Sequence, residues 1–300
     1  MNSDYACHDT ISCELRANLK TVSEQREERL SNQQQYTNYA RQVFFSALYT
    51  ENYVLGALIL GYSIRKYHPN HLMYMMYLDD KIKNNTLMAL KEVGWLVLPV
   101  ARIEPPLKGT HKRFIDQFTK LTLWSFTQYD SIIYLDSDTV VMNDISHLHH
   151  LVSNPFRTGF EFAAATDNWF GTYIYKFNAG VIVLHPSKLV YNELMRVYNI
   201  PDNYNPIMAE QEFLNQYFRL RYLELPTIYN MNMAVYSSYK NLWYKLRPDF
   251  KVVHYTIFKP FLGKYQRGYD GPYELYKEIW QDFTSHVDIN RIKTKWNLRW

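Results

Sequence analysis

The sequence predicts an α/β fold in which a mostly parallel central sheet is flanked by helices. From residue 42 onward, short runs of β-branched and aromatic residues alternate with helical patterns, and such alternation requires crossovers between parallel strands. The chain of 300 residues is 47% hydrophobic, which is enough to bury a large core. Its two cysteines, Cys7 and Cys13, lie in a polar stretch and provide neither a disulfide framework nor a metal site.

The first half of the folded region is expected to alternate regularly between strands and helices. Its first helix stops before Pro69, because a proline disfavours helical geometry at the residue before it. Asn84 or Asn85 is expected near the cap of the second helix. The strands are predicted at 42–49, 72–78, 95–100 and 131–135, and the helices at 53–67, 84–94 and 114–128.

The alternation loosens after Asp138. Residues 1–40 are polar and charge-dense without an apolar stripe, so we expect a flexible arm or a marginal exposed helix there. The basic end of the chain, 284–300, is interpreted as a solvated terminal helix, which leaves one folded domain at 41–283. Later strands are predicted at 179–185 and 251–255, and later helices at 187–199 and 209–219.

Charge and hydropathy exclude several classes of protein. The formal charge of +4 fits binding of an anionic small molecule and falls short of a nucleic-acid footprint. The beginning of the chain lacks the apolar core of a signal peptide, so we expect a cytoplasmic protein and interpret the sequon at 84–86 as chance. The longest apolar run, 54–64, is too short to span a bilayer and predicts a buried helix, so no transmembrane segment is expected.

The stretch "SIIYLDSDTVVMND", residues 131–144, holds the most informative pattern. An apolar strand ends in Asp136 and Asp138, with Ser137 between them. In open α/β sheets ligands bind at the carboxyl ends of strands, and alternation along an extended segment points both carboxylates the same way. Two such carboxylates repel each other unless a cation lies between them, and Mn²⁺ and Mg²⁺ take oxygen ligands. The pattern therefore predicts a divalent metal site.

Three interpretations of the carboxylate pair remain open at this point. The pair could belong to a turn or a helix cap, which aspartates often form. It resembles the motif of haloacid-dehalogenase phosphatases, with Asp136 as nucleophile and Asp138 as acid and base, although that family places the motif in its first strand. It also fits a nucleotide-sugar glycosyltransferase, in which a metal neutralises the departing diphosphate.

Five motifs in order favour the last interpretation. They are "YVLGALILGYSIRKY" at 53–67, "TKLTLWSFTQYDSIIYLDSDTVV" at 119–141, "AAATDNWFGTYIYKFNAGVIVLHPS" at 163–187, "AEQEFLNQYF" at 209–218 and "VVHYTIFKPF" at 252–261. From Val43 to Phe261 the chain resembles the family 8 glycosyltransferases, in particular glycogenin and its relatives, which include galactinol synthase. The resemblance implies a single GT-A type, Rossmann-like catalytic domain at 41–283. It also implies transfer of glucose or galactose from a UDP-sugar with retention of configuration, using Mn²⁺ or Mg²⁺.

The resemblance assigns roles to individual residues. The implied metal ligands are Asp136, Asp138 and His254. Nucleotide and diphosphate contacts are implied for Ala47, Tyr49, Thr50, Tyr53, Arg113 and Lys259, and contacts with the donor in general for Lys120 and Ser137. Contacts with the transferred sugar are implied for Asp167, Asn178, Ala179, Gly180, Glu210 and Gln211, and the catalytic roles fall to Asp167, Glu210, Gln211 and Lys259.

Three departures from the family pattern stand out. Glu210 replaces an aspartate, and Ile207 replaces an acidic residue of glycogenin. The segment between His254 and Lys259 lacks the family's glycine. The acceptor chemistry of glycogenin therefore does not transfer directly to this chain.

The acceptor stays open at the level of sequence. Glycogenin glucosylates a tyrosine of its own, and the segment "LPTIYNMNMAVYSSY" at 225–239 offers Tyr236 first and Tyr239 second. An acceptor sugar or a polyol remains an alternative to a tyrosine of the chain. Formation of a homodimer is a separate possibility that the sequence leaves open. A module that binds a sugar nucleotide without turning it over is a further alternative, although binding alone would not need all of the metal and diphosphate residues.

Overall fold

The structure is a computed structural model that describes residues 40–106, 108–167, 175–200 and 203–299. The chain divides into two units, Met1–Ala40 and Arg41–Trp300, and the helices and strands named in this section belong to the second unit. The arm predicted at 1–40 lies outside the described residues, apart from Ala40.

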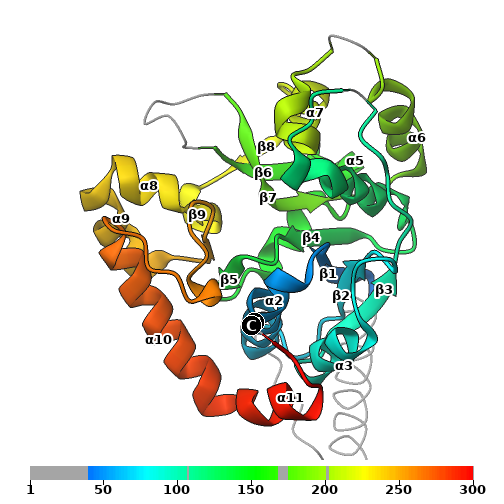
Figure 1. The fold of residues 1–300 in the computed structure, drawn as a ribbon. Coiled ribbons are helices and arrows are strands. Elements are labelled where there is room, and N and C mark those ends of the chain that lie inside the picture. The colour runs from blue at the N-terminus through cyan, green and yellow to red at the C-terminus, as the bar shows by residue number, and fades with distance from the viewer. Residues whose placement is uncertain (1–39, 107, 168–174, 201–202, 300) are drawn as a thin grey trace, which may run out of the picture. The chain divides into compact units, whose positions relative to one another are not determined.

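A seven-stranded sheet forms the centre of the second unit (Figure 1). Its strands are β1 (Gln42–Leu48), β2 (Met73–Tyr77), β3 (Leu96–Pro99), β4 (Ser131–Leu135), β6 (Phe162–Thr166), β7 (Phe177–Leu184) and β8 (Leu223–Leu225). They lie in the order β3-β2-β1-β4-β7-β6-β8. Only β7 runs antiparallel to its neighbours, so the predicted mostly parallel sheet is confirmed.

A small second sheet explains how distant residues meet. It consists of β5 (Thr139–Val141), β10 (Val252–His254) and β9 (Met231–Asn232), in the order β5-β10-β9. β10 pairs antiparallel with β5, which places His254 opposite Thr139, and parallel with β9, which places His254 opposite Asn232. A histidine from late in the chain therefore lies beside the turn that joins β4 to β5.

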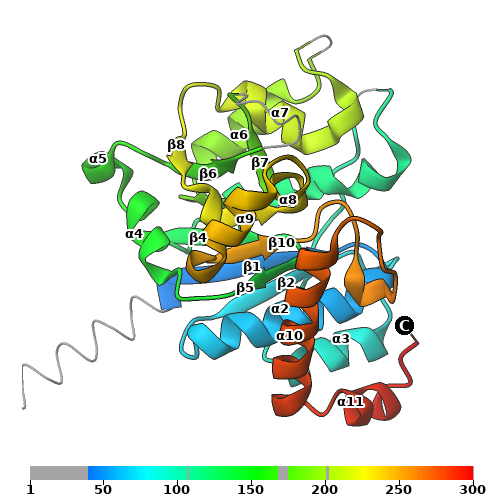
Figure 2. The same cartoon turned by 90° about the vertical axis from the view of Figure 1, so that its left-hand side faces the viewer.

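Helices cover both faces of the large sheet (Figures 1 and 2). The core on one face includes α2 (Val54–Tyr67), α3 (Asn84–Glu92), α10 (Asp270–His286) and α11 (Ile289–Lys295). The core on the other face includes the 3₁₀ helix η2 (Lys112–Ser125), α6 (Lys188–Val197) and α7 (Ala209–Tyr217). The remaining helices are α4 (His149–Val152), α5 (Pro155–Thr158), α8 (Met233–Ser238), α9 (Lys240–Leu246) and the 3₁₀ turns η1 (Glu51–Tyr53), η3 (Ser146–Leu148), η4 (Pro206–Met208), η5 (Thr227–Asn230), η6 (Arg247–Asp249) and η7 (Pro260–Leu262).

Alternation along β1 shows why the central strands are apolar throughout. Phe44 and Leu48 belong to the core on one face, whereas Phe45 and Ala47 belong to the core on the other. Successive side chains of a strand point to opposite faces, so a strand that is covered on both faces has no position for an exposed residue. This burial holds the carboxyl ends of β1 and β4 in fixed positions, and the predicted binding residues follow these ends.

The apolar run at 54–64 forms most of α2, as predicted. Ten of its residues are buried, and Gly61 lies so close to Trp95 that an added Cβ would approach the indole nitrogen to 2.4 Å. A glycine is required there because the indole N–H donates to the carbonyl of Ala57 over 2.9 Å. Across the described ranges, no helix is both long enough and apolar enough to cross a membrane.

Several predicted elements needed correction. The helix predicted at 114–128 is the 3₁₀ helix η2, which ends at Ser125. In α3, by contrast, the prediction that Asn84 lies near the cap is confirmed, because the helix begins at Asn84 and its N-cap is Lys83, whose backbone N–H donates to Glu51 over 2.7 Å. The sequence did not predict β6, β8 or α8 to α10.

The basic end of the chain is docked rather than solvated. α10 runs through the expected domain end at 283. Ile289 and Ile292 of α11 are buried, which the solvated-helix interpretation did not anticipate. Arg291 and Lys295 both bind Glu92 at the end of α3, at 2.9 and 2.6 Å. The last helix therefore belongs to the packed core of this unit.

Candidate active site

Asp136, Asp138 and His254 come together as the sequence predicted. Their ligand atoms all lie within 4.8 Å of one another, and among the described residues they form the one group of this kind. The Nε2 atom of His254 lies 3.1 Å from Oδ1 of Asp138. Two carboxylates and an imidazole suit Mn²⁺ and are compatible with Mg²⁺. The donor set therefore fits the divalent cation that the resemblance implies.

Lys259 completes what we call the metal side of the site, which comprises Asp136, Asp138, His254 and Lys259. Its ammonium contacts the carboxylate of Asp138 and the carbonyl oxygens of Tyr255 and Thr256. Burial alone would raise the pKa of Asp138, but the charges of Lys259 and His254 hold it well below its usual range. Asp138 is therefore ionised, as a metal ligand must be.

Two glycines allow the close approach that this geometry needs. A Cβ on Gly180 of β7 would lie 2.1 Å from Cε1 of His254, so only glycine lets the imidazole rest against the strand. A Cβ on Gly56 of α2 would lie 2.6 Å from the carbonyl oxygen of Ser137. The first turn of α2 therefore packs directly against the turn that carries the two aspartates.

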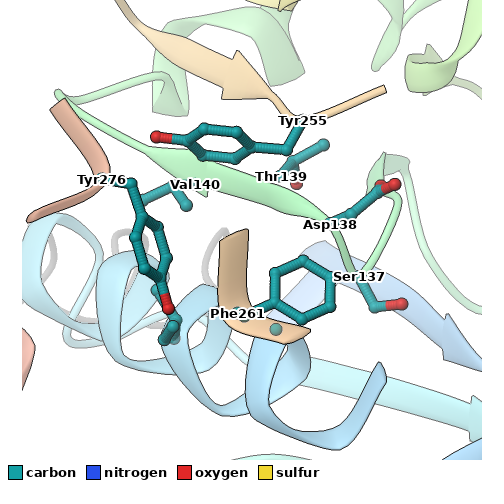
Figure 3. Close-up of a pocket in the computed structure, with 9 residues that line it drawn as sticks. Ser137, Asp138, Thr139, Val140, Tyr255, Phe261 and Tyr276 are labelled. Carbon is teal, nitrogen blue, oxygen red and sulfur yellow. The ribbon is translucent and has the colours of Figure 1, made fainter. Parts of the chain in front are cut away.

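Figure 3 shows this turn beside a small cavity. Ser137 and Asp138 lie at one end, with the Phe261 ring beside them, and Tyr255 and Tyr276 line the rest. The cavity measures about 10 Å³, which holds at most a single water. It is a packing gap behind the metal side and not the seat of a sugar nucleotide.

Lys120 is buried and contacts three residues of the site. Its ammonium donates to the carbonyl of Ala179 over 3.0 Å and to Glu210 over 2.8 Å, and it lies 3.3 Å from Oδ1 of Asp136. An ammonium has three donors, so all of them are used. Burial lowers the pKa of Lys120, but the two carboxylates outweigh it and raise the pKa overall, so the side chain stays charged.

Glu210 pairs with Lys120 at the start of α7. The side chain is buried, and burial raises the pKa of Glu210 while Lys120 opposes the rise. Ala209, just before it, has a φ of 49°, a left-handed conformation that strains a residue with a side chain. Glu210 follows this strained residue and contacts Lys120 over 2.8 Å, a pairing that the sequence did not predict.

A second hydrogen-bonded group joins the end of β6, the start of β7 and α7 through Asp167, Asn178 and Gln211. Gln211 donates to Oδ2 of Asp167 over 3.0 Å, and Asn178 approaches Oδ1 at 3.5 Å. The backbone N–H of Ala179 donates to Gln211 over 3.0 Å. Burial raises the pKa of Asp167 to about 6 despite these amide donors. We call Lys120, Asp167, Asn178, Glu210 and Gln211 the sugar side of the site.

Asn230 is a site residue that the sequence analysis missed. Its Oδ1 lies 3.0 Å from Nδ1 of His254, and its Nδ2 donates to Oδ1 of Asn178 over 3.0 Å. Asn230 is completely buried, and its two hydrogen bonds join the metal side to the sugar side. The available signal was the Tyr-Asn pair at the end of "LPTIYN", a segment from which only acceptor tyrosines were predicted.

The predicted nucleotide residues cluster at the carboxyl end of β1. Ala47 and Tyr49 are buried and Thr50 is exposed. The Tyr53 ring lies 5.9 Å from the Lys259 ammonium, and burial together with the charges of Asp138 and Asp136 raises the pKa of Tyr53. Arg113 is exposed at the start of η2, and its charge reaches Tyr53.

The two acceptor candidates differ in accessibility. Tyr236 is 1% exposed, and its hydroxyl accepts a hydrogen bond from the backbone N–H of Gly271 over 3.2 Å. Its ring packs against Trp243 and Tyr269. Tyr239 is 42% exposed. A hydroxyl must leave such packing to attack a donor, so the burial of Tyr236 counts against its predicted role.

Comparison with known proteins identifies the family. The model described as Glycosyl transferase family 8 matches residues 42–263. The chain belongs to this family. The resemblance drawn from the five motifs is thereby confirmed, and the phosphatase interpretation of the aspartate pair loses its support.

Named relatives extend the comparison. UDP-glucuronate:xylan alpha-glucuronosyltransferase 2 of Arabidopsis thaliana is 27% identical over 80% of this chain and 38% of its own length. Galactinol synthase 2 of the same plant is 27% identical over 69% of this chain and 68% of its own length. The chain thus spans less than half of the first relative and about two thirds of the second.

Solved structures confirm the fold. The glycosyltransferase GlyE of Streptococcus pneumoniae superposes with a TM-score of 0.57 at 19% identity, covering 86% of this chain and 65% of that one. The galactosyltransferase LgtC, solved with donor and acceptor sugar analogues, gives a TM-score of 0.58 at 19% identity, covering 79% and 94%. The predicted GT-A type α/β fold is therefore correct.

Proposed function

We propose that this family 8 glycosyltransferase is a metal-dependent, retaining enzyme that transfers glucose or galactose from a UDP-sugar to a hydroxyl group. The observation that carries the proposal is the meeting of Asp136, Asp138 and His254 within 4.8 Å, next to Lys259. A nucleoside diphosphate is a good leaving group only when its charge is neutralised. The metal side concentrates the groups that this step needs.

Mn²⁺ or Mg²⁺, held by Asp136, Asp138 and His254, would supply that neutralisation when bound. Lys259 adds a positive charge from the same side and Tyr53 lies over it, at 5.9 Å from the ammonium. We assign both residues to the diphosphate rather than to the sugar. Ala47, Tyr49, Thr50 and Arg113 border this side and are assigned to the nucleotide.

The sugar side holds the hexose through hydrogen bonds. Each carboxylate oxygen of Asp167 already accepts one amide contact and keeps a lone pair for a sugar hydroxyl. Gln211 is fixed at both ends of its amide, which favours it over Glu210 for steadying the anomeric centre. The Glu210 carboxylate is neutralised by Lys120.

Retention is assigned to front-face displacement. Glu210 and Asp136 are both tied to Lys120, and neither is offered as a covalent nucleophile. In this mechanism the acceptor hydroxyl attacks on the side of the departing diphosphate, and a diphosphate oxygen takes its proton. The sugar side keeps the hexose in place while the bond to the diphosphate breaks.

An external sugar or polyol is the acceptor that we favour. The burial of Tyr236 supports this choice over self-glycosylation, and Tyr239 stays a secondary candidate. The names of two relatives specify a xylan and an inositol phosphorylceramide as acceptors, so acceptors vary among the relatives. Intact-mass analysis after incubation with donor and Mn²⁺ tests self-transfer, because a ladder of hexose increments would contradict an external acceptor.

The decisive experiment is donor hydrolysis with a panel of UDP-glucose, UDP-galactose and UDP-glucuronate. UDP-glucuronate is included because the name of a relative specifies it. We expect UDP release from UDP-glucose or UDP-galactose that requires Mn²⁺ or Mg²⁺ and stops with chelator. Release that persists in chelator would contradict the metal role. Binding without any release would support a non-catalytic module, and preference for UDP-glucuronate would contradict the assigned hexose.

A further inference from the structure

The buried side-chain amides between the two sides have a defined orientation. The backbone N–H of Gly180 donates to one atom of the Asn178 amide over 3.0 Å. A backbone N–H is always a donor, so the atom that receives it is the oxygen Oδ1. Amide nitrogen and oxygen are otherwise assigned only from their hydrogen-bonding partners, and this contact removes the ambiguity for Asn178.

The orientation of the Asn178 amide also determines the orientation of the Asn230 amide and, through it, of the His254 ring. Asn230 reaches the same Oδ1 of Asn178 over 3.0 Å, so the atom of Asn230 that lies there is its donating Nδ2. The other atom of that amide, Oδ1, then faces Nδ1 of His254 at 3.0 Å and accepts its proton. Nε2 is left facing the carboxylates of Asp138 and Asp136.

We propose that Asn230 is a positioning residue, which fixes the ring orientation and tautomer of His254 so that Nε2 is presented to a divalent cation. This inference rests on the metal site of the proposed function. The partner of the remote nitrogen sets which nitrogen of a ligating histidine is available, and its loss commonly weakens metal binding about 10- to 100-fold. Gly180 contributes twice, through its N–H and through the space it leaves for the imidazole.

The chemistry selects asparagine at this position. Asn230 is completely buried and uses both ends of its amide, one as acceptor and the other as donor. An alanine offers neither group. An aspartate keeps the acceptor for His254, but its second oxygen would face Oδ1 of Asn178, which is already an acceptor. The two functions of Asn230 can therefore be separated by substitution.

The same set of contacts continues into the sugar side. With Oδ1 of Asn178 occupied, its Nδ2 turns toward Oδ1 of Asp167 at 3.5 Å. The backbone N–H of Ala179 orients Gln211 in the same way, so that Gln211 donates to the other oxygen of Asp167. Consecutive backbone amides of β7 thus orient both the metal-ligating histidine and the acceptor groups for the sugar.

The test measures Mn²⁺ binding by calorimetry in the absence of any donor. We expect Asn230→Ala to bind Mn²⁺ about 10- to 100-fold more weakly than wild type. Asn230→Asp should keep Mn²⁺ affinity within a few-fold and instead raise the KM for the UDP-sugar, because the repulsion falls on Asn178. This pair keeps the inference testable even if the alanine variant does not fold.

Asn232→Ala is the matched control. Asn232 is equally buried and two positions away, and it lies opposite His254 in the β9–β10 pair, but its side-chain Oδ1 caps α8 through the N–H of Ala234, whereas the side-chain partner of His254 is Asn230. We expect it to lower the melting temperature while leaving Mn²⁺ affinity unchanged. Wild-type affinity in Asn230→Ala, or equal losses in all three variants, would overturn the inference. If the wild type bound Mn²⁺ and only this ranking failed, the proposed function would still stand.

Discussion

The metal side and the sugar side balance their charges in different ways. On the metal side Asp138 contacts His254 and Lys259. The other partners of these two residues are uncharged, namely the side-chain amide of Asn230 and main-chain carbonyls. A bound cation or diphosphate can therefore replace the contacts of Asp138 with His254 and Lys259. On the sugar side Lys120 uses every donor, and Gln211 and Asn178 are bonded at both ends. The metal side can therefore exchange its partners for a ligand, whereas the sugar side is rigid.

The largest expected effect comes from removing the anionic centre of the metal side. Asp138→Asn removes the charge between His254 and Lys259, and we expect donor hydrolysis to fall about 10³-fold with the fold retained. UDP release and circular dichroism measure the two effects. Activity near wild type, with or without chelator, would show that the exchangeable half is not the catalytic one.

The sugar side is expected to respond through stability. Glu210→Gln leaves the buried Lys120 with a single carboxylate partner, Asp136. Breaking a buried ion pair on one side costs about 3 kcal/mol, measured as the free energy of unfolding in urea. Glu212→Gln is the matched control on the same helix, because Glu212 pairs with the half-exposed Lys176 and its loss costs about 1 kcal/mol or less. Equal losses in the two variants would contradict the rigid-half interpretation.

Asp167→Asn sharpens the comparison through pH. The pKa of Asp167 is raised from 3.8 to about 6, so the folded protein holds this proton more tightly than the unfolded chain. The contribution of this group to stability is therefore fully present below the unfolded pKa, and about 3 kcal/mol is lost as the pH rises through about 6. An uncharged asparagine avoids this loss, so the variant should gain stability relative to wild type as the pH rises from about 4 to about 6, and the difference should then stay constant above about pH 7. A stability difference that does not change with pH would contradict the raised pKa.

The smallest effect is expected for Tyr236→Phe. The hydroxyl accepts a hydrogen bond from the backbone N–H of Gly271 and also bonds to the Tyr244 hydroxyl, so its loss should cost about 1 to 2 kcal/mol of stability. Donor hydrolysis should stay within two-fold of wild type, and intact mass should show no hexose in either protein. A hexose ladder on the wild type that disappears in the variant would restore the self-glycosylation hypothesis.

The sequence predicted what is local and missed what depends on contacts across the chain. Asp136 and Asp138 follow an apolar strand, and that pattern alone placed them at a strand end. His254 needed the resemblance, since its place beside Asp138 comes from the pairing of β10 with β5. The contacts of Asn230 with residues from two other parts of the chain have no counterpart in local spacing.

The misjudged elements have physical reasons as well. The many tyrosines made Tyr236 a plausible acceptor, but only the packing of α8 against Gly271 reveals its burial. The Lys120–Glu210 pair joins residues 90 positions apart, so no local spacing would suggest it. The basic composition of 284–300 predicted solvation, whereas Ile289 and Ile292 provided enough apolar surface to dock α11.

The docking of α11 has a practical consequence for anyone who shortens this protein. Glu92 holds Arg291, Lys295 and the indole N–H of Trp296, so one carboxylate fastens the last helix to α3. Truncation at residue 283, where composition suggests a boundary, would remove the last turn of α10 and all of α11. It would also expose the apolar surface against which Ile292 packs. A shortened version that ends there should aggregate on expression, whereas one that retains residues through 298 should behave like the parent.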